Sequence, residues 1–216
     1  ELAEWNTKPG EGGAPSVDTV YNPAALPGLD SRITYVHSQA TVGIDWRPAA
    51  DYARRGGFYG VTFHDYTDSD DAFGFKQVDY EVVQHFPILR ETWAISVRGL
   101  WQTTATKDDQ EIPYFMLPSL GGGSNLRGYS SWRFRDRNSL LLQGEWRIMV
   151  NRYLDTAFFY DTGMVTRLTA DLDVDDLKHD FGFGVRFHTP IATPLRIDLA
   201  KSPEGLALVF STSSAF

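Results

Sequence analysis

Regular alternation of apolar and polar residues constrains the fold of this chain more than any other feature. Within residues 34–47, for example, Val42, Ile44 and Trp46 alternate with polar residues. A period of two places successive side chains on opposite faces of a β-strand. The other segments with this pattern are 58–66, 73–86, 93–103, 140–148, 154–162, 181–187, 195–200 and 206–216. They predict an all-β, antiparallel fold of nine strands, with residues 1–10 as a candidate tenth.

Two classes of all-β protein fit this alternation. In a soluble sandwich the polar face meets water, whereas in an outer-membrane barrel the apolar face meets lipid and the polar face lines a lumen. No apolar run reaches the roughly 18 residues of a spanning helix, but spanning strands do not need one. In a membrane barrel, the residues expected to face lipid are Val42, Ile44, Trp46, Trp146, Ile148, Ile197 and Leu199. The residues expected to face the lumen are Asp45, Glu145, Asp161, Arg186 and Asp198.

The lengths of the connections favour the membrane barrel. The connections after Ile148 and Phe187 are short, whereas those at 106–138 and 163–179 are long, so that long and short connections alternate in the second half of the chain. Bacterial barrels have long external loops and short periplasmic turns. We therefore expect the long connections to lie outside the cell and Phe216 to lie on the periplasmic side.

Charge and residue types argue against several functions. The chain has 20 basic and 28 acidic residues, and its net charge of −8 argues against nucleic-acid binding. It has no cysteine, and its five histidines lack metal-ligand spacing. No Gly-x-Ser-x-Gly nucleophile motif is present, and the acidic run 171–176 lacks the ligand spacing of a calcium loop. We therefore expect no catalytic residue, metal or cofactor.

The longest connection contains the most unusual stretch of the chain, residues 120–136. It reads Leu-Gly-Gly-Gly-Ser-Asn-Leu-Arg-Gly-Tyr-Ser-Ser-Trp-Arg-Phe-Arg-Asp. Glycine lets the backbone adopt positive φ angles and approach other groups closely, and arginine pairs well with partly desolvated carboxylates. This combination indicates a loop that folds back and docks.

The stretch resembles the inward-folded loop of the BamA/TamA outer-membrane assembly superfamily, the bacterial surface antigen type. Residues 159–163 resemble the Phe-x-Asp-x-Gly strand of this family, and residues 182–187 with 194–200 resemble its last strands. Three motifs in the right order make the resemblance specific, and it covers roughly residues 30 to 216. The loop motif that it implies comprises Arg127, Gly128, Tyr129, Arg133, Phe134, Arg135 and Asp136.

The resemblance also implies how this loop docks. In the family, the loop arginine enters the lumen and contacts the strand that carries Phe-x-Asp-x-Gly. Carried over, Arg127 pairs with Asp161, with Glu145 as a second candidate partner, and stacks near Phe159. The docking residues implied on the strands are Glu145, Arg147, Phe159, Asp161 and Gly163. The residues implied to form the C-terminal strand signal are Phe210 and Phe216.

The second basic cluster of the loop leaves two alternatives open. Arg133, Arg135 and Asp136 either line the lumen or satisfy one another within the loop. The sequence alone does not separate these arrangements.

The chain also departs from the family pattern. The family's barrels have sixteen strands and usually follow periplasmic POTRA domains, whereas this chain has nine or ten strands and no such domain. We expect residues 1–216 to form one barrel domain in which 106–138 is an external loop folded into the lumen. Because Glu1 lies in a strand-like segment, we expect the C-terminal portion of a larger barrel, in preference to a shortened relative that closes alone or with a partner.

The function implied by the resemblance is assembly or translocation of proteins, or of lipids, at the bacterial outer membrane. The implied partners are outer-membrane lipids, unfolded outer-membrane protein clients, and either other complex subunits or a second copy that completes the barrel. The alternatives are a passive pore or structural barrel and, as a third option, an outer-membrane hydrolase. No enzymatic activity is expected.

Overall fold

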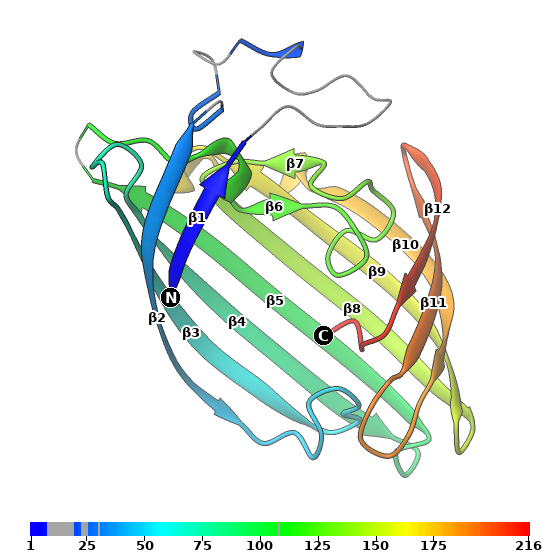
Figure 1. Cartoon of the computed structure of the whole chain (residues 1–216). Coiled ribbons are helices and arrows are strands. Elements are labelled where there is room, and N and C mark those ends of the chain that lie inside the picture. The colour runs from blue at the N-terminus through cyan, green and yellow to red at the C-terminus, as the bar shows by residue number, and fades with distance from the viewer. Residues whose placement is uncertain (8–19, 23–25, 30, 108) are drawn as a thin grey trace.

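The computed structural model describes residues 1–7, 20–22, 26–29, 31–107 and 109–216, and its main feature is one large antiparallel sheet (Figure 1). Its ten strands lie side by side in chain order, and neighbouring strands are antiparallel. They are β1 (Leu2–Asn6), β2 (Arg32–Asp45), β3 (Gly56–Asp68), β4 (Phe75–Ile88), β5 (Trp93–Thr106), β8 (Asn138–Asn151), β9 (Leu154–Thr166), β10 (Lys178–Phe187), β11 (Leu195–Ser202) and β12 (Gly205–Ser211). The predicted all-β fold is confirmed, and so is the tenth strand. Most of the loop predicted at 10–31 lies outside the described residues.

The remaining elements are short and lie in two connections. The connection between β5 and β8 contains the 3-10 helix η2 (Tyr114–Met116) and a small two-stranded sheet of β6 (Ser119–Leu120) and β7 (Phe134–Arg135). The connection between β9 and β10 contains the 3-10 helices η3 (Thr169–Asp171) and η4 (Val174–Asp176). Among the described residues, no helix is long and apolar enough to cross a membrane.

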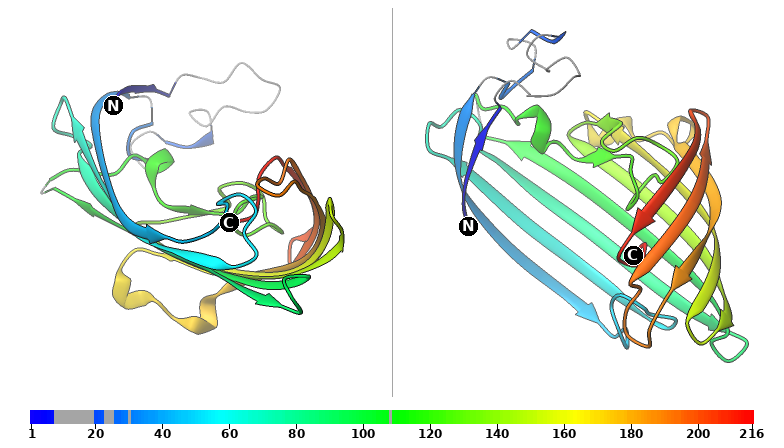
Figure 2. Two further views of the ribbon diagram at one scale, coloured as in Figure 1. Left: turned by 90° about the horizontal axis from the view of Figure 1, so that it is seen from below. Right: turned by 45° about the vertical axis from the view of Figure 1, so that its right-hand side comes forward.

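The sheet is curved, and its two faces are inverted relative to a water-soluble protein. The β5–β8 connection and the C-terminal segment lie on the concave side (Figure 2). On the other face Phe183 is 55% exposed, whereas Asp198 on the concave face is fully buried. A continuous exposed apolar face is unstable in water but suits lipid.

The predicted alternation of faces is confirmed along most strands. The residues predicted to face lipid are exposed or partly exposed, namely Val42, Ile44, Trp46, Trp146, Ile148, Ile197 and Leu199. The residues of the lumen set that are buried are Glu145, Asp161, Arg186 and Asp198. Asp45 differs, because it is exposed at the end of β2, where it forms an ion pair with Arg47 at 2.9 Å.

The predicted contrast between the two ends of the sheet is met only in part. The long connections 107–137 and 167–177 lie at one end, and the tight turn at 152–153 lies at the other (Figure 1). However, the connection at 203–204 is also tight, although it lies at the same end as the long ones. The turn 46–55, at the opposite end, is longer than the other turns there. The reason is that turn 46–55 packs against other turns, as described below.

The prediction that the last strand continues to Phe216 is wrong. Strand β12 ends at Ser211, and the ring of Phe216 lies inside, stacked near His85 with 6.4 Å between ring centroids. Side-chain hydroxyl groups of serine compete with the backbone pairing of a strand, and here the hydroxyl of Ser211 accepts a hydrogen bond from the N–H of Ser213. Phe210 does lie on β12, with its side chain exposed.

Candidate functional site

The loop arginine of the predicted motif lies at the centre of a buried charged cluster on the concave face. Arg127 is fully buried. Its Nε donates to Oδ2 of Asp161 at 2.6 Å, and its Nη2 donates to Oδ1 of the same carboxylate at 2.8 Å. This two-bond geometry is the strongest that an arginine and a carboxylate can form. The structure therefore brings the loop to β9 through Arg127 and Asp161.

The remaining side of the guanidinium group is also occupied. Nη1 of Arg127 donates to Glu145 at 3.0 Å and to Asp198 at 3.3 Å. Its central carbon lies 3.6 Å from the centroid of the Phe159 ring, in the stacked position that arginine prefers. Strands β8, β9 and β11 thus each supply a carboxylate to one loop residue. Asp198 was predicted to face the lumen but was not predicted to bind the loop.

Two further arginines extend this cluster along the strands. Arg186 donates to Glu145 at 2.7 Å and also to Asp198. Arg196 lies 3.3 Å from Asp198 and donates to the carbonyl oxygen of Gly123 in the loop. Removing one partner from such a buried network leaves an uncompensated charge, which costs about 3–5 kcal/mol. The buried charged cluster therefore couples the position of the loop to the strands that form the wall.

Glycines allow the loop backbone to approach the wall. Gly121 and Gly122 have φ angles of +110° and +108°, which other residues rarely adopt. At Gly128, a Cβ atom would lie 2.7 Å from the Cβ of Asp180 and 2.9 Å from the Cβ of Ser202. The carbonyl oxygen of Gly128 accepts a hydrogen bond from Ser202 at 2.7 Å. A glycine is therefore required between Arg127 and Tyr129, because a side chain at this position would collide with Asp180 and Ser202.

An apolar cluster anchors the loop beside the charged one. Leu120, Leu126 and Tyr129 of the loop are buried with Leu141 of β8. The side chain of Leu120 packs over Gly163, where an added Cβ would lie 2.9 Å from it. The predicted docking position of Gly163 thus provides space for a loop side chain. Additional contacts are made by Phe134, whose ring lies edge-on to Tyr129, and by the Tyr129 hydroxyl, which donates to the carbonyl oxygen of His179.

The second basic cluster of the loop follows neither of the two alternatives. Arg133 is half exposed and pairs with Glu204 at 2.8 Å. Arg135 donates to the carbonyl oxygen of Tyr114 at 3.1 Å. Asp136 accepts from the backbone N–H of the next residue, so it pairs with neither arginine. These residues shape the loop at its outer end and do not enter the buried cluster.

Arg147 was predicted as a docking residue, but it belongs to a different network. It lies 3.8 Å from Glu145, yet its Nη2 donates to Ser96 at 3.0 Å and to the carbonyl oxygen of Ala53. Among the described residues it has no hydrogen bond to the loop. Its inward direction followed from alternation, but its height along the strand places it nearer turn 46–55.

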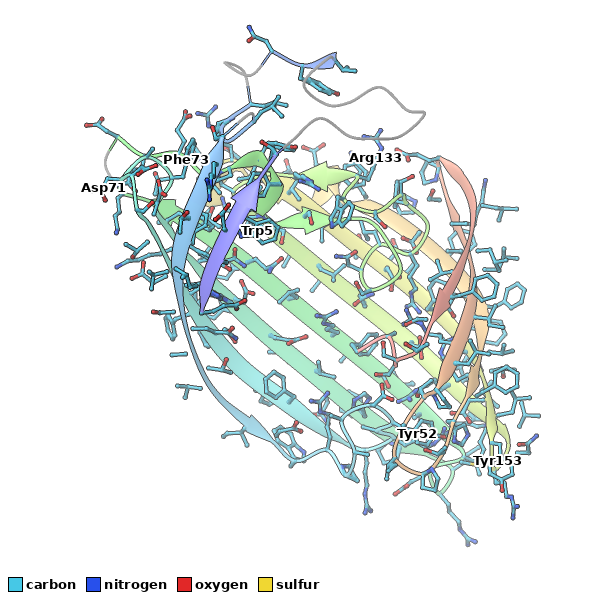
Figure 3. All side chains as sticks on the ribbon, viewed as in Figure 1. Trp5, Tyr52, Asp71, Phe73, Arg133 and Tyr153 are labelled. Carbon is cyan, nitrogen blue, oxygen red and sulfur yellow. The ribbon has the colours of Figure 1, made fainter. Side chains whose placement is uncertain are left out.

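This turn forms a second polar cluster that sequence reasoning missed. Nη1 of Arg54 pairs with Asp155 of β9 at 2.5 Å. The hydroxyl of Tyr52 donates to the same carboxylate at 3.0 Å, and His188 lies 3.2 Å from it. Burial, followed by the charge of Asp155, raises the pKa of Tyr52 to about 12, so this hydroxyl stays a donor. Tyr52 lies at the end of the sheet opposite Arg133 (Figure 3).

Turn 46–55 also connects distant parts of the chain. Asp51 accepts hydrogen bonds from the N–H groups of Thr193 and Ser214. Arg54 donates to the carbonyl oxygens of Glu91 and Thr92 in the β4–β5 turn. A tyrosine and three arginines in this connection were the available signal. The partners of the tyrosine and of Arg54 lie too far away in the sequence to form a local pattern.

Comparisons with known proteins agree with this architecture. The family model described as "Omp85 superfamily domain" matches residues 52–206. A crystal structure of BamA from Haemophilus ducreyi lacking POTRA domains 1–3 has a similar fold, with a TM-score of 0.69 and 16% sequence identity. The match covers 85% of this chain and 44% of that one, so this chain spans less than half of that structure. A search of curated proteins found no match. The chain therefore belongs to the Omp85 superfamily.

Proposed function

We propose that this chain forms part of an outer-membrane barrel that assembles or translocates proteins, or lipids, and that its docked loop braces the barrel wall. The single observation that carries this proposal is the fully buried Arg127, which binds carboxylates from three different strands. A passive pore does not require such a costly buried charge cluster. The loop contributes rigidity and position, and no covalent step is proposed.

The proposed surroundings follow from the two faces of the sheet. The apolar face contacts outer-membrane lipid, and the end with the long connections faces outward. Unfolded outer-membrane proteins are the proposed clients. The two edge strands of the sheet, β1 and β12, are where further strands of a larger barrel, other subunits or a second copy would complete the wall.

The proposal is tested with Arg127→Ala in cells that depend on this protein. Loss of a buried, paired arginine weakens docking by about 3–5 kcal/mol, so we expect lower amounts of folded outer-membrane proteins. The matched control is Arg133→Ala, in the same loop but half exposed, which should leave those amounts unchanged.

The passive-pore alternative gives a different result in the same experiment. If Arg127→Ala increases ion conductance but leaves the amounts of folded outer-membrane proteins at the wild-type level, the assembly function is refuted.

A further inference from the structure

One more carboxylate lies beneath the docked loop. Asp180 of β10 is directly opposite Asp161 of β9, and both side chains are fully buried. Gly128 lies so close to Asp180 that a Cβ atom on this glycine would be 2.7 Å from the Asp180 Cβ. The docked loop therefore separates Asp180 from water.

Among the described residues, no hydrogen bond of normal geometry reaches the carboxylate of Asp180. Neither of its carboxylate oxygens has a hydrogen-bond partner among the described residues. The backbone of Gly128 lies against the Asp180 side chain but supplies no hydrogen bond of normal geometry to it. The polar side chain directly across the strand pair is that of Asp161, which is also a buried carboxylate. Two ionised carboxylates in contact repel each other, whereas one shared proton turns the contact into a hydrogen bond.

The buried ion pairs around these two carboxylates do not include Asp180. The groups joined by buried ion pairs are four arginines and three acids, namely Arg127, Arg147, Arg186, Arg196, Glu145, Asp161 and Asp198. None of the hydrogen bonds of Arg127 goes to Asp180. Further titratable groups beside Asp180 or on β9, β10 and β11 are Tyr129, Arg133, Asp155, Tyr160, Lys178, His179, Lys201 and Glu204. Of these, Lys178 lies on the same face of β10 as Asp180, and it is exposed. Arg147 directs its hydrogen bonds to Ala53 and Ser96. An ionised Asp180 would therefore be an unpaired buried charge, which is very costly.

We propose that Asp161 and Asp180 form a proton-binding site that links docking of the loop to pH. This inference rests on the docked loop of the proposed function and adds its regulation. When the loop leaves, Asp180 meets water, where an aspartate releases its proton near pH 4. Above about pH 4 the docked state therefore holds a proton that the undocked state has lost. Docking weakens as pH rises, by at most about tenfold per pH unit.

The test measures the loop position directly in the full chain in lipid. Spin labels are placed at Ser130 in the loop and at Lys201 on β11, both of which are exposed, and the distance between them is measured from pH 5 to pH 9. In the wild type we expect one short distance at low pH and a growing longer-distance population as pH rises. In Asp180→Asn, which keeps the shape without a titrating group, we expect the short distance at every pH.

Two controls make the result specific. Asp176→Asn, in the exposed connection between β9 and β10, should keep the wild-type pH dependence. If Asp180→Asn does not fold, Asp180→Ser also supplies a donor without a titrating carboxyl group, and it should give the same pH-independent docking.

Three outcomes would overturn the inference. They are a wild-type distance that does not change with pH, a pH dependence that persists in the Asp180 variants, and loss of docking in those variants at every pH. A wild-type distance that stays short at every pH would refute the link to pH but would leave the docked loop of the proposed function intact. A long distance at all pH values in the wild type would instead refute the docking on which both proposals depend.

Discussion

At the scale of single residues, burial decides which charges matter in this protein. Arg54 and Arg55 are adjacent in the sequence, yet their side chains are 6% and 63% exposed. Arg54 pairs with the buried Asp155, whereas Arg55 pairs with the exposed Glu91 at 3.3 Å. Exposed ion pairs contribute about 0–1 kcal/mol, but breaking a buried pair costs several times more.

This contrast predicts different effects for two neighbouring substitutions. Arg54→Ala should lower the free energy of unfolding by about 3–5 kcal/mol, because Asp155 is left buried without its partner. Arg55→Ala should change it by at most about 1 kcal/mol. Urea unfolding of the protein in lipid vesicles measures both values. Equal costs for the two variants would show that turn 46–55 is not packed as described.

At the scale of elements, alternation in the sequence predicts the strands well because each strand carries its own local signal. Segment 34–47 corresponds to β2 (Arg32–Asp45) for this reason. Alternation also predicts that Arg147 points inward, but it does not reveal which inward group it meets.

Contacts between distant segments could not be predicted from the same signal. Tyr52 and Asp155 are 103 positions apart, and no local pattern links a turn residue to a strand so far away. The partner of Arg127 came from resemblance to a family and not from the residues themselves. The position of Phe216 depends on the serine hydroxyl groups that end β12. The alternation of apolar residues does not show where such groups end a strand. Sequence reasoning thus reached the sheet and the loop tip, but not the second polar cluster.

At the scale of the whole molecule, the inverted distribution of polarity is the main physical property. Charged side chains such as Asp198 are buried on the concave face, and aromatic side chains such as Phe183 are exposed on the other. This distribution is stable only where the outer surface meets lipid and the inner charges pair with one another.

A charge placed on the outer face should therefore be costly only within the membrane. Phe183→Arg, near the middle of β10, should lower the free energy of unfolding in lipid vesicles by about 2–4 kcal/mol and so destabilise the protein. Leu172→Arg lies in the connection between β9 and β10 and should have an effect near zero, on the order of 0–1 kcal/mol. A negligible cost for Phe183→Arg would contradict the membrane assignment of this face.

We infer that the pairing of Arg127 with Asp161 holds the loop in the lumen. The measurement that tests it most directly is a double-mutant cycle of Arg127→Ala and Asp161→Ala, read as free energies of unfolding in lipid. We predict that the double variant loses much less than the sum of the two single losses, because each single change already breaks the same buried pair. The matched cycle on the exposed pair Arg133 and Glu204 should show a coupling of at most about 1 kcal/mol. If the losses of Arg127→Ala and Asp161→Ala add to within about 0.5 kcal/mol, the two residues act independently and the docked loop is contradicted.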